Sequence, residues 1–195
     1  MNRRVEVAEA REVFRSAFFS VKEATLRYER FDGQMSEPVT RLYFDRGDSV
    51  AALLHDPAAD TLTLVEQFRY PAYVTGHGWL LELPAGVVER DSGESEEETM
   101  RREIMEETGY VVASLEPITT CYPSPGGSSE RIFLYYAQIS EDVRHGPGGG
   151  VDAGEDTRVV TLPVEEALRR LDAGEIVDAK TIIALQWLAG RRGNR

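Results

Sequence analysis

The sequence contains a single cysteine, Cys121, among its 195 residues. One cysteine cannot form a disulfide within the chain, so we expect a reducing compartment. Its neighbours Thr120 and Tyr122 are typical of a β-strand, which favours a packing role for the thiol. Long apolar runs are also missing. No stretch approaches the ~20 residues needed to cross a bilayer, and the first ten residues lack an apolar signal core. The cytoplasm is therefore the expected location.

Positive charge is scarce as well. The chain has 22 Lys and Arg residues against 34 Asp and Glu residues, a net charge of −12, and no basic block. Nucleic acids and membrane surfaces are therefore not expected partners, since both are anionic. An acidic protein that acts on an anionic small molecule needs a metal ion and local arginines to offset the repulsion. The length and the hydrophobic share of 42% predict a packed domain of ordinary size.

The acidic residues concentrate between Glu94 and Glu107, where seven glutamates accompany only Arg101 and Arg102. Glu103 and Glu107 stand four residues apart and so share one face of a helix, where like charges destabilise it. A cation usually offsets such a cluster, and Mg²⁺ prefers oxygen ligands. The alternative interpretation is a solvated acidic face.

Local signals predict a helix around these carboxylates. Ser95 and Glu98 form a capping-box pattern, and Gly109 is a typical C-terminal stop. Met100 and Ile104 form an apolar ridge beside the carboxylates. We therefore expect the carboxylates to lie at the border between core and solvent.

The segment from Gly86 to Tyr110 resembles the Nudix signature, in which a Gly leads to a Glu and then to Arg-Glu-apolar-x-Glu-Glu-x-Gly-apolar. The second half here reads Glu94, then Arg102-Glu103-Ile104-Met105-Glu106-Glu107-Thr108-Gly109-Tyr110, with the spacing intact. Gly86 lies two residues further from Glu94 than in the signature. We interpret residues 90–93 as a lengthened loop, which costs little closure entropy.

The resemblance implies roles for the residues of this signature. Glu103, Glu107 and the Ala85 carbonyl would hold Mg²⁺, or Mn²⁺ in its place. Glu106 would be either a further ligand or an outer acceptor. Gly86, Glu94 and Arg102 would be structural, with Arg102 bridging back to Glu94.

The similarity extends over nearly the whole chain and is greatest to the bacterial ADP-ribose pyrophosphatase branch, with the GDP-mannose hydrolase branch close. Pro125, fifteen residues beyond Tyr110 (125 − 110), is the marker, within the stretch SPGGSSER. This implies Mg²⁺-dependent hydrolysis of ADP-ribose to AMP and ribose 5-phosphate. The alternatives are hydrolysis of GDP-mannose or other nucleotide sugars, and a non-catalytic nucleotide-sugar sensor. A sensor would be expected to have lost the acids of the signature, which this chain keeps.

Positions outside the signature are implied to bind substrate. They are Phe18, Arg41, Arg46, Arg69, Ser124, Gly126 and Glu130. Phe18 would contact the adenine or else pack in a core. The arginines would hold phosphates or the terminal ribose, because a guanidinium can bind phosphate with two hydrogen bonds. Glu130 would line the site or pair with strand neighbours of Arg131.

The resemblance implies that a glutamate in the glycine-rich stretch between Glu141 and Arg158 acts as general base, and long loops in compact domains often carry active-site acids. The resemblance places the base at Ala153, which cannot serve. Glu155 matches the neighbouring metal-contacting glutamate. Either Glu155 also takes the base role, or Asp152 does with a shifted loop. The predicted catalytic residues are therefore Glu155 and Glu106.

The predicted fold is α/β: a mixed sheet between helices, as in the Nudix α/β/α sandwich, preceded by an antiparallel β-segment. We expect a boundary that separates residues 1–47 from a catalytic domain at 48–195. In the second part, strands are predicted at 49–55, 61–68, 79–83, 111–115, 118–122, 132–139 and 159–162, and helices at 95–109, 164–171 and 179–189. Asp32-Gly33 predicts a two-residue hairpin turn. The family resemblance implies that the first segment exchanges between two subunits, giving a homodimer with shared sites.

Overall fold

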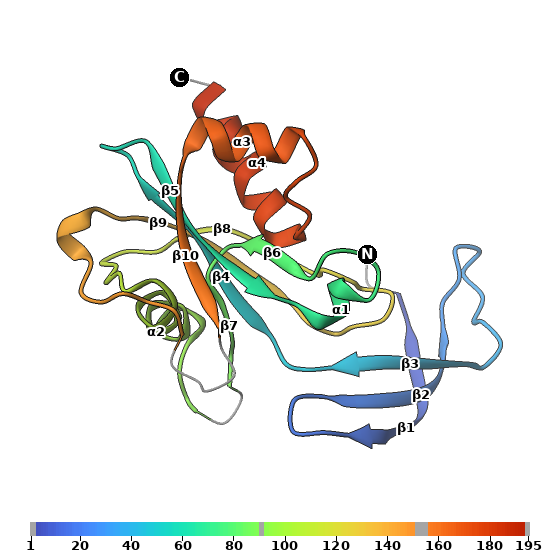
Figure 1. Ribbon diagram of the computed structural model, residues 1–195. Coiled ribbons are helices and arrows are strands. Elements are labelled where there is room, and N and C mark those ends of the chain that lie inside the picture. The colour runs from blue at the N-terminus through green and yellow to red at the C-terminus, as the bar shows by residue number, and fades with distance from the viewer. Residues whose placement is uncertain (1–2, 90–91, 151–155, 194–195) are drawn as a thin grey trace. The chain divides into compact units, whose positions relative to one another are not determined.

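A computed structural model describes residues 3–89, 92–150 and 156–193 (Figure 1). The chain divides into two compact units. The first comprises Met1–Gly47 with Tyr122–Glu130, and the second comprises Asp48–Cys121 with Arg131–Arg195. The segment 122–130 therefore belongs with the N-terminal strands, although it lies far along the chain.

The first unit is an antiparallel sheet in the order β1 (Val5–Arg15), β2 (Ser20–Tyr28) and β3 (Val39–Asp45). The turn after β2 spans three residues, 31–33, because the Arg30 N–H donates to the Gln34 carbonyl at 2.8 Å. The prediction of a two-residue turn was wrong by one residue. Gly33 adopts the positive φ of 80° that such a loop requires.

The second unit contains a mixed sheet, as predicted. Its main strands, in spatial order, are β10 (Thr157–Pro163), β5 (Thr61–Phe68), β4 (Ser49–Asp56), β9 (Ile132–Gln138) and β8 (Glu116–Cys121). The short strands β6 (Trp79–Glu82) and β7 (Ala85–Val87) pair with β5 and β4. The β4–β9 pair is parallel and the other pairs are antiparallel.

Helices cover both faces of this sheet. α2 (Glu96–Thr108) lies on one face, and α3 (Val164–Asp172) and α4 (Ala179–Gly193) lie on the other (Figure 1). Two short helical segments, α1 (Tyr70–Tyr73) and η1 (Glu141–Val143), lie in connections. The predicted α/β sandwich is therefore confirmed. Within the described ranges, we find no helix with the length and apolar content to cross a membrane.

The strand β4 separates two parts of the core. Ala51 and Leu53 pack toward α3 and α4, whereas Val50, Ala52 and Leu54 pack toward Met100 and Ile104 of α2. All five β4 side chains are fully buried. This alternation follows from the two-residue period of a strand and fixes α2 against the sheet.

The prediction of a strand at 111–115 was wrong. These residues form an irregular connection, and β8 begins at Glu116. Val112 and Leu115 are buried against α2, while the Val112 carbonyl accepts a bond from Arg101 Nη1 at 2.7 Å. The apolar residues here bury an irregular segment under the helix, so their pattern resembled that of a strand.

Candidate active site

The helix α2 begins and ends at the residues that the sequence indicates. The Ser95 side chain accepts from the Glu98 N–H at 3.3 Å, and Glu98 Oε2 accepts from the Ser95 N–H at 2.9 Å. Gly109 ends the helix with φ = 78°. Met100 and Ile104 are fully buried, so the orientation of the helix about its axis is fixed by packing.

Two carboxylates of α2 lie against the backbone at the start of β7. The Ala85 N–H donates to Glu107 Oε2 at 2.9 Å, and Glu107 is 5% exposed. A Cβ atom on Gly86 would lie only 2.1 Å from Glu103 Cδ, so the Glu103 carboxylate occupies the space that a side chain would fill. Glu103, Glu107 and the Ala85–Gly86 backbone thus meet at one place.

Sheet pairing holds this backbone in position. β7 pairs with β4, with Ala85 opposite Ala51 and Gly86 opposite Val50. The Ala52 N–H also donates to the Pro84 carbonyl at 3.1 Å. Because seven of the eight residues of β4 are buried, residues 84–87 are attached to the most completely buried strand of the unit.

Arg102 lies among the remaining acids of the cluster. Its guanidinium contacts Glu106 at 2.8 Å, Glu103 at 2.9 Å and Glu94 at 3.5 Å. Partial burial of the guanidinium opposes its charge, but the nearby charges of Glu103 and Glu106 outweigh this and raise the pKa of Arg102. The arginine therefore offsets part of the carboxylate repulsion and joins the loop at Glu94 to the helix.

The donor set suits a hard divalent cation. No trio of His, Cys, Asp and Glu side chains poised to hold a metal occurs in residues 3–89, 92–150 and 156–193. The pair Glu103 and Glu107, with the Ala85 carbonyl, nevertheless offers only oxygen donors. Mg²⁺ commonly takes one or two carboxylates and keeps several waters. The space at Gly86 admits the Glu103 carboxylate, so these residues fit such an ion.

The glycine-rich stretch packs on the C-terminal end of α2. The N–H groups of Gly149 and Gly150 donate to the carbonyls of Glu107 and Glu106 at 2.8 and 3.2 Å. A Cβ atom on Gly148, whose φ is 71°, would lie 2.4 Å from the Glu107 carbonyl oxygen. These carbonyls lack partners within the helix, so the loop satisfies them.

The predicted bases follow directly after this contact. Asp152 and Glu155, with Ala153 between them, lie outside the described residues. The structure describes the start of their loop, residues 148–150, which packs on the C-terminal end of the helix that carries Glu103, Glu106 and Glu107.

Arg69 makes an ion pair that the sequence did not predict. Its Nε and Nη2 atoms donate to the two Glu82 carboxylate oxygens at 3.1 and 2.8 Å, and Lys180 Nζ donates to the same carboxylate at 2.8 Å. Burial alone would raise the pKa of Glu82, but the bonds from Arg69 and the charge of Lys180 keep this pKa below its usual value. Glu82 is the only charged residue of the strand predicted at 79–83, and this isolated acid was the available signal.

Six predicted substrate residues belong to the first unit. Phe18 is 87% exposed, which argues against core packing within this chain. Arg46 Nε lies 3.8 Å from Glu130 Oε1, so these two side chains are brought together, and Glu130 pairs with Arg46. Arg41, Ser124 and Gly126 are exposed. The segment 122–130 reaches this place because the Phe44 N–H donates to the Gly127 carbonyl at 2.8 Å.

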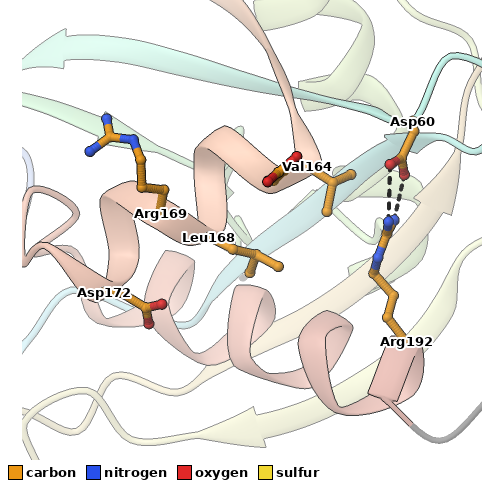
Figure 2. A pocket seen from close by; sticks show the side chains of 7 residues that line it. Asp60, Val164, Leu168, Arg169, Asp172 and Arg192 are labelled. Atoms are coloured by element: carbon orange, nitrogen blue, oxygen red, sulfur yellow. Dashed lines mark hydrogen bonds and ion pairs between the residues drawn. The ribbon is translucent and has the colours of Figure 1, made fainter.

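Two concavities lie on the α3 and α4 side of the second unit. One of about 460 Å³ is lined by Asp60, Val164, Glu165, Leu168, Arg169, Asp172 and Arg192 (Figure 2). The other, of about 590 Å³, is lined by ten residues that include His55, Tyr136 and Trp187. The predicted site residues line neither concavity. The Asp60–Arg192 ion pair joins a turn to the end of α4 (Figure 2).

Comparison with known proteins identifies the family. The NUDIX domain matches residues 45–185. The chain is 40% identical over 180 residues to an ADP-ribose pyrophosphatase of Escherichia coli O6:H1, covering 92% of this chain and 85% of that relative. It is 41% identical over 160 residues to a GDP-mannose pyrophosphatase of Pectobacterium atrosepticum, covering 81% and 80%.

A solved structure supports the fold. The crystal structure of an ADP compounds hydrolase superposes with a TM-score of 0.68 at 21% identity, covering 96% of this chain and 95% of the other. At this identity the similarity concerns the fold alone.

Proposed function

Since the chain belongs to the Nudix domain family, we propose that it hydrolyses the pyrophosphate bond of ADP-ribose to AMP and ribose 5-phosphate. The observation that carries the proposal is the cluster of Glu103 and Glu107 against the Ala85–Gly86 backbone, in a chain 40% identical to an ADP-ribose pyrophosphatase. The cluster supplies oxygen donors for a cation, which an acidic chain needs in order to bind pyrophosphate.

We assign the metal-holding role to Glu103, Glu107 and the Ala85 carbonyl, with Mg²⁺ as the ion and Mn²⁺ as a substitute. When bound, the ion would neutralise phosphate charge and lower the pKa of coordinated water. The Ala85 N–H bond orients the Glu107 carboxylate. The ion pair with Arg102 keeps Glu106 beside Glu103 and Glu107. In that position Glu106 serves as a further ligand or an outer acceptor.

The reaction requires a carboxylate that takes a proton from water. The water oxygen attacks one phosphorus atom, and the bond from that phosphorus to the bridging oxygen breaks. The bridging oxygen leaves with the electron pair as part of the second phosphate. We assign the role of proton acceptor to Glu155, with Asp152 as the alternative. The packing of Gly148 on Glu107 supports a base close to the metal-holding helix.

We propose that the first unit supplies the nucleoside and phosphate contacts. The residues are Phe18, Arg41, Arg46, Ser124, Gly126 and Glu130, together with Arg69 from the second unit. Exposed aromatic and arginine side chains suit a base and phosphates. We also propose a cytoplasmic homodimer in which the N-terminal segment exchanges between subunits, because apolar residues on β1 remain exposed in the single chain.

A panel of nucleotide sugars, with and without Mg²⁺, tests the activity. We expect kcat/KM to be highest for ADP-ribose, with AMP and ribose 5-phosphate as products and no turnover after chelation. Equal or higher kcat/KM for GDP-mannose would favour the second candidate, which the 41% identical relative supports. Tight binding of ADP-ribose without hydrolysis in Mg²⁺ would identify a sensor and refute the enzymatic proposal.

A further inference from the structure

The N-terminal end of α4 contacts the strand that leads into the active site. The Leu83 N–H donates to Thr181 Oγ1 at 2.9 Å, and Thr181 Oγ1 donates to Asp178 Oδ2 at 2.6 Å. Thr181 is fully buried. Leu83 stands two residues before Ala85 in the sequence. The threonine therefore fixes the backbone just before the point where Glu103 and Glu107 meet it.

The residue before Thr181 contacts the residue before Leu83. Lys180 Nζ lies 2.8 Å from Glu82 Oε2 and 3.0 Å from Asp178 Oδ1. Glu82 and Lys180 are 3% and 9% exposed, so both charges are held in low-dielectric surroundings by this pairing. The same Glu82 carboxylate accepts two bonds from Arg69, which orients the guanidinium.

Two consecutive residues, Glu82 at the end of β6 and Leu83 directly after it, are thus held by different groups near the start of α4. Thr181 holds a backbone N–H, and Lys180 holds a side chain. Asp178 joins the two, because its Oδ2 accepts from Thr181 while its Oδ1 lies beside Lys180. Both contacts span 98 residues of sequence. A merely local helix cap would require only the Thr181 N–H bond to Asp178 at 3.0 Å.

We propose that Thr181 and Lys180 are positioning residues for the active site, acting through different partners. Thr181 sets the Leu83–Gly86 backbone and so the placement of the Ala85 carbonyl toward a bound metal. Lys180 sets Glu82 and through it the direction of Arg69 toward substrate phosphate. The inference rests on the proposed function of Glu103, Glu107 and Arg69, and it adds a residue set from α4 to that site.

The two roles predict different kinetic signatures. Thr181→Val keeps the volume but removes the acceptor of the Leu83 N–H. We expect Mn²⁺ to bind the substrate-free enzyme about 10–100-fold more weakly, as for other residues that orient metal ligands. We expect kcat to fall by a similar factor at fixed metal, with little change in KM. Lys180→Met should instead raise KM for ADP-ribose and leave Mn²⁺ affinity unchanged.

Matched variants separate positioning from general destabilisation. Thr181→Ser keeps the hydroxyl and should restore Mn²⁺ affinity to within about twofold of the wild type, since its hydroxyl retains the acceptor for the Leu83 N–H. Thr63→Val changes another threonine that is 1% exposed, in β5, and should leave both Mn²⁺ affinity and kcat unchanged. If Thr181→Val does not fold, Thr181→Cys, close in size but a weak acceptor, takes its place.

The deciding measurement is Mn²⁺ binding by calorimetry without substrate, with circular dichroism to check folding. Equal Mn²⁺ affinities for the wild type, Thr181→Val and Thr63→Val would overturn the role of Thr181. An unchanged KM in Lys180→Met would overturn the role of Lys180. Absence of ADP-ribose hydrolysis by the wild type would defeat the proposed function instead, and Mn²⁺ affinity would still test the role of Thr181.

Discussion

The strands β1 and β4 show how differently the two units are stabilised. All eleven residues of β1 are exposed, including Val5, Val7 and Phe14, which are 60%, 58% and 52% exposed. The first seven of the eight residues of β4 are buried. β4 has packed side chains on both faces, whereas β1 is the edge of a three-stranded, single-layer sheet.

This difference corresponds to the two tasks that we propose for the chain, metal binding in the second unit and subunit association in the first. A layer buries its apolar face only against a second layer, which β4 has within its own unit. The second unit can therefore hold carboxylates at fixed positions. The apolar residues of β1 lack such cover within the first unit, which suits the surface where we propose that two subunits associate.

The largest effect is expected from a change in the second unit that leaves its core intact. Glu107→Gln removes one negative charge from the metal-holding pair but keeps an acceptor for the Ala85 N–H. We expect kcat to fall by about 10³-fold, or about 4 kcal/mol of transition-state stabilisation, with an unchanged melting temperature and association state. Steady-state kinetics with ADP-ribose and Mg²⁺ provide the measurement.

Glu97→Gln is the matched control, because Glu97 lies on the same helix with its side chain 53% exposed. It should retain full activity. Equal turnover by Glu107→Gln and the wild type would remove metal binding at Glu107 from the mechanism.

The next effect compares the two units directly. Leu53→Ala in β4 removes a fully buried side chain and should lower the free energy of unfolding by about 2–5 kcal/mol. Leu42→Ala in β3 removes a side chain that is 56% exposed and should cost the single chain less than about 1 kcal/mol. Urea denaturation of both variants at low protein concentration checks the contrast. Equal losses would show that β3 is as well packed as β4.

A change on β1 tests association. Val7→Glu adds a negative charge to an apolar strand of a chain whose net charge is already −12. We expect the dimer to dissociate at least about tenfold more readily, which corresponds to about 1.4 kcal/mol. Sedimentation velocity gives the dissociation constant, and Gln34→Glu, at an exposed position directly after the turn at 31–33, serves as the control. A wild type that is monomeric at all concentrations would refute the proposed homodimer.

The smallest effect is expected at an exposed ion pair of the second unit. Hydrogen bonds from Arg169 and Arg170 lower the pKa of Glu166 to about 2. The folded-state pKa lies below the unfolded one, so any stabilisation is present above about pH 4.5 and is lost as the pH falls toward 2. Because these groups are exposed, water and salt screen them strongly.

We therefore expect Glu166→Gln to change stability far less than Leu53→Ala does, and not at all in high salt. Thermal melts at pH 7 and pH 3, in low and high salt, provide the test. A large, salt-independent loss at pH 7 would show that exposed ion pairs stabilise the second unit as much as its core does.

Local sequence patterns predicted the elements correctly where the determining residues are near neighbours. The capping box of Ser95 and Glu98 and the stop at Gly109 predicted α2, because each bond joins residues within one or two turns. The apolar run at 132–139 predicted the strand β9, which the structure places between β4 and β8. The strand at 111–115 was wrong because burial under α2 produces the same apolar pattern as a strand.

The sequence alone determined the helix, the spacing of Glu103, Glu106 and Glu107 on it, and the family to which this arrangement belongs. Only the tertiary structure decided how the Ala85–Gly86 backbone meets Glu103 and Glu107, through the Ala85 N–H and the space at Gly86. It also decided that Thr181 and Lys180 reach Leu83 and Glu82 across 98 residues. The physical reason is that helix caps and periodicity are local, whereas these contacts depend on how the sheet brings distant segments together.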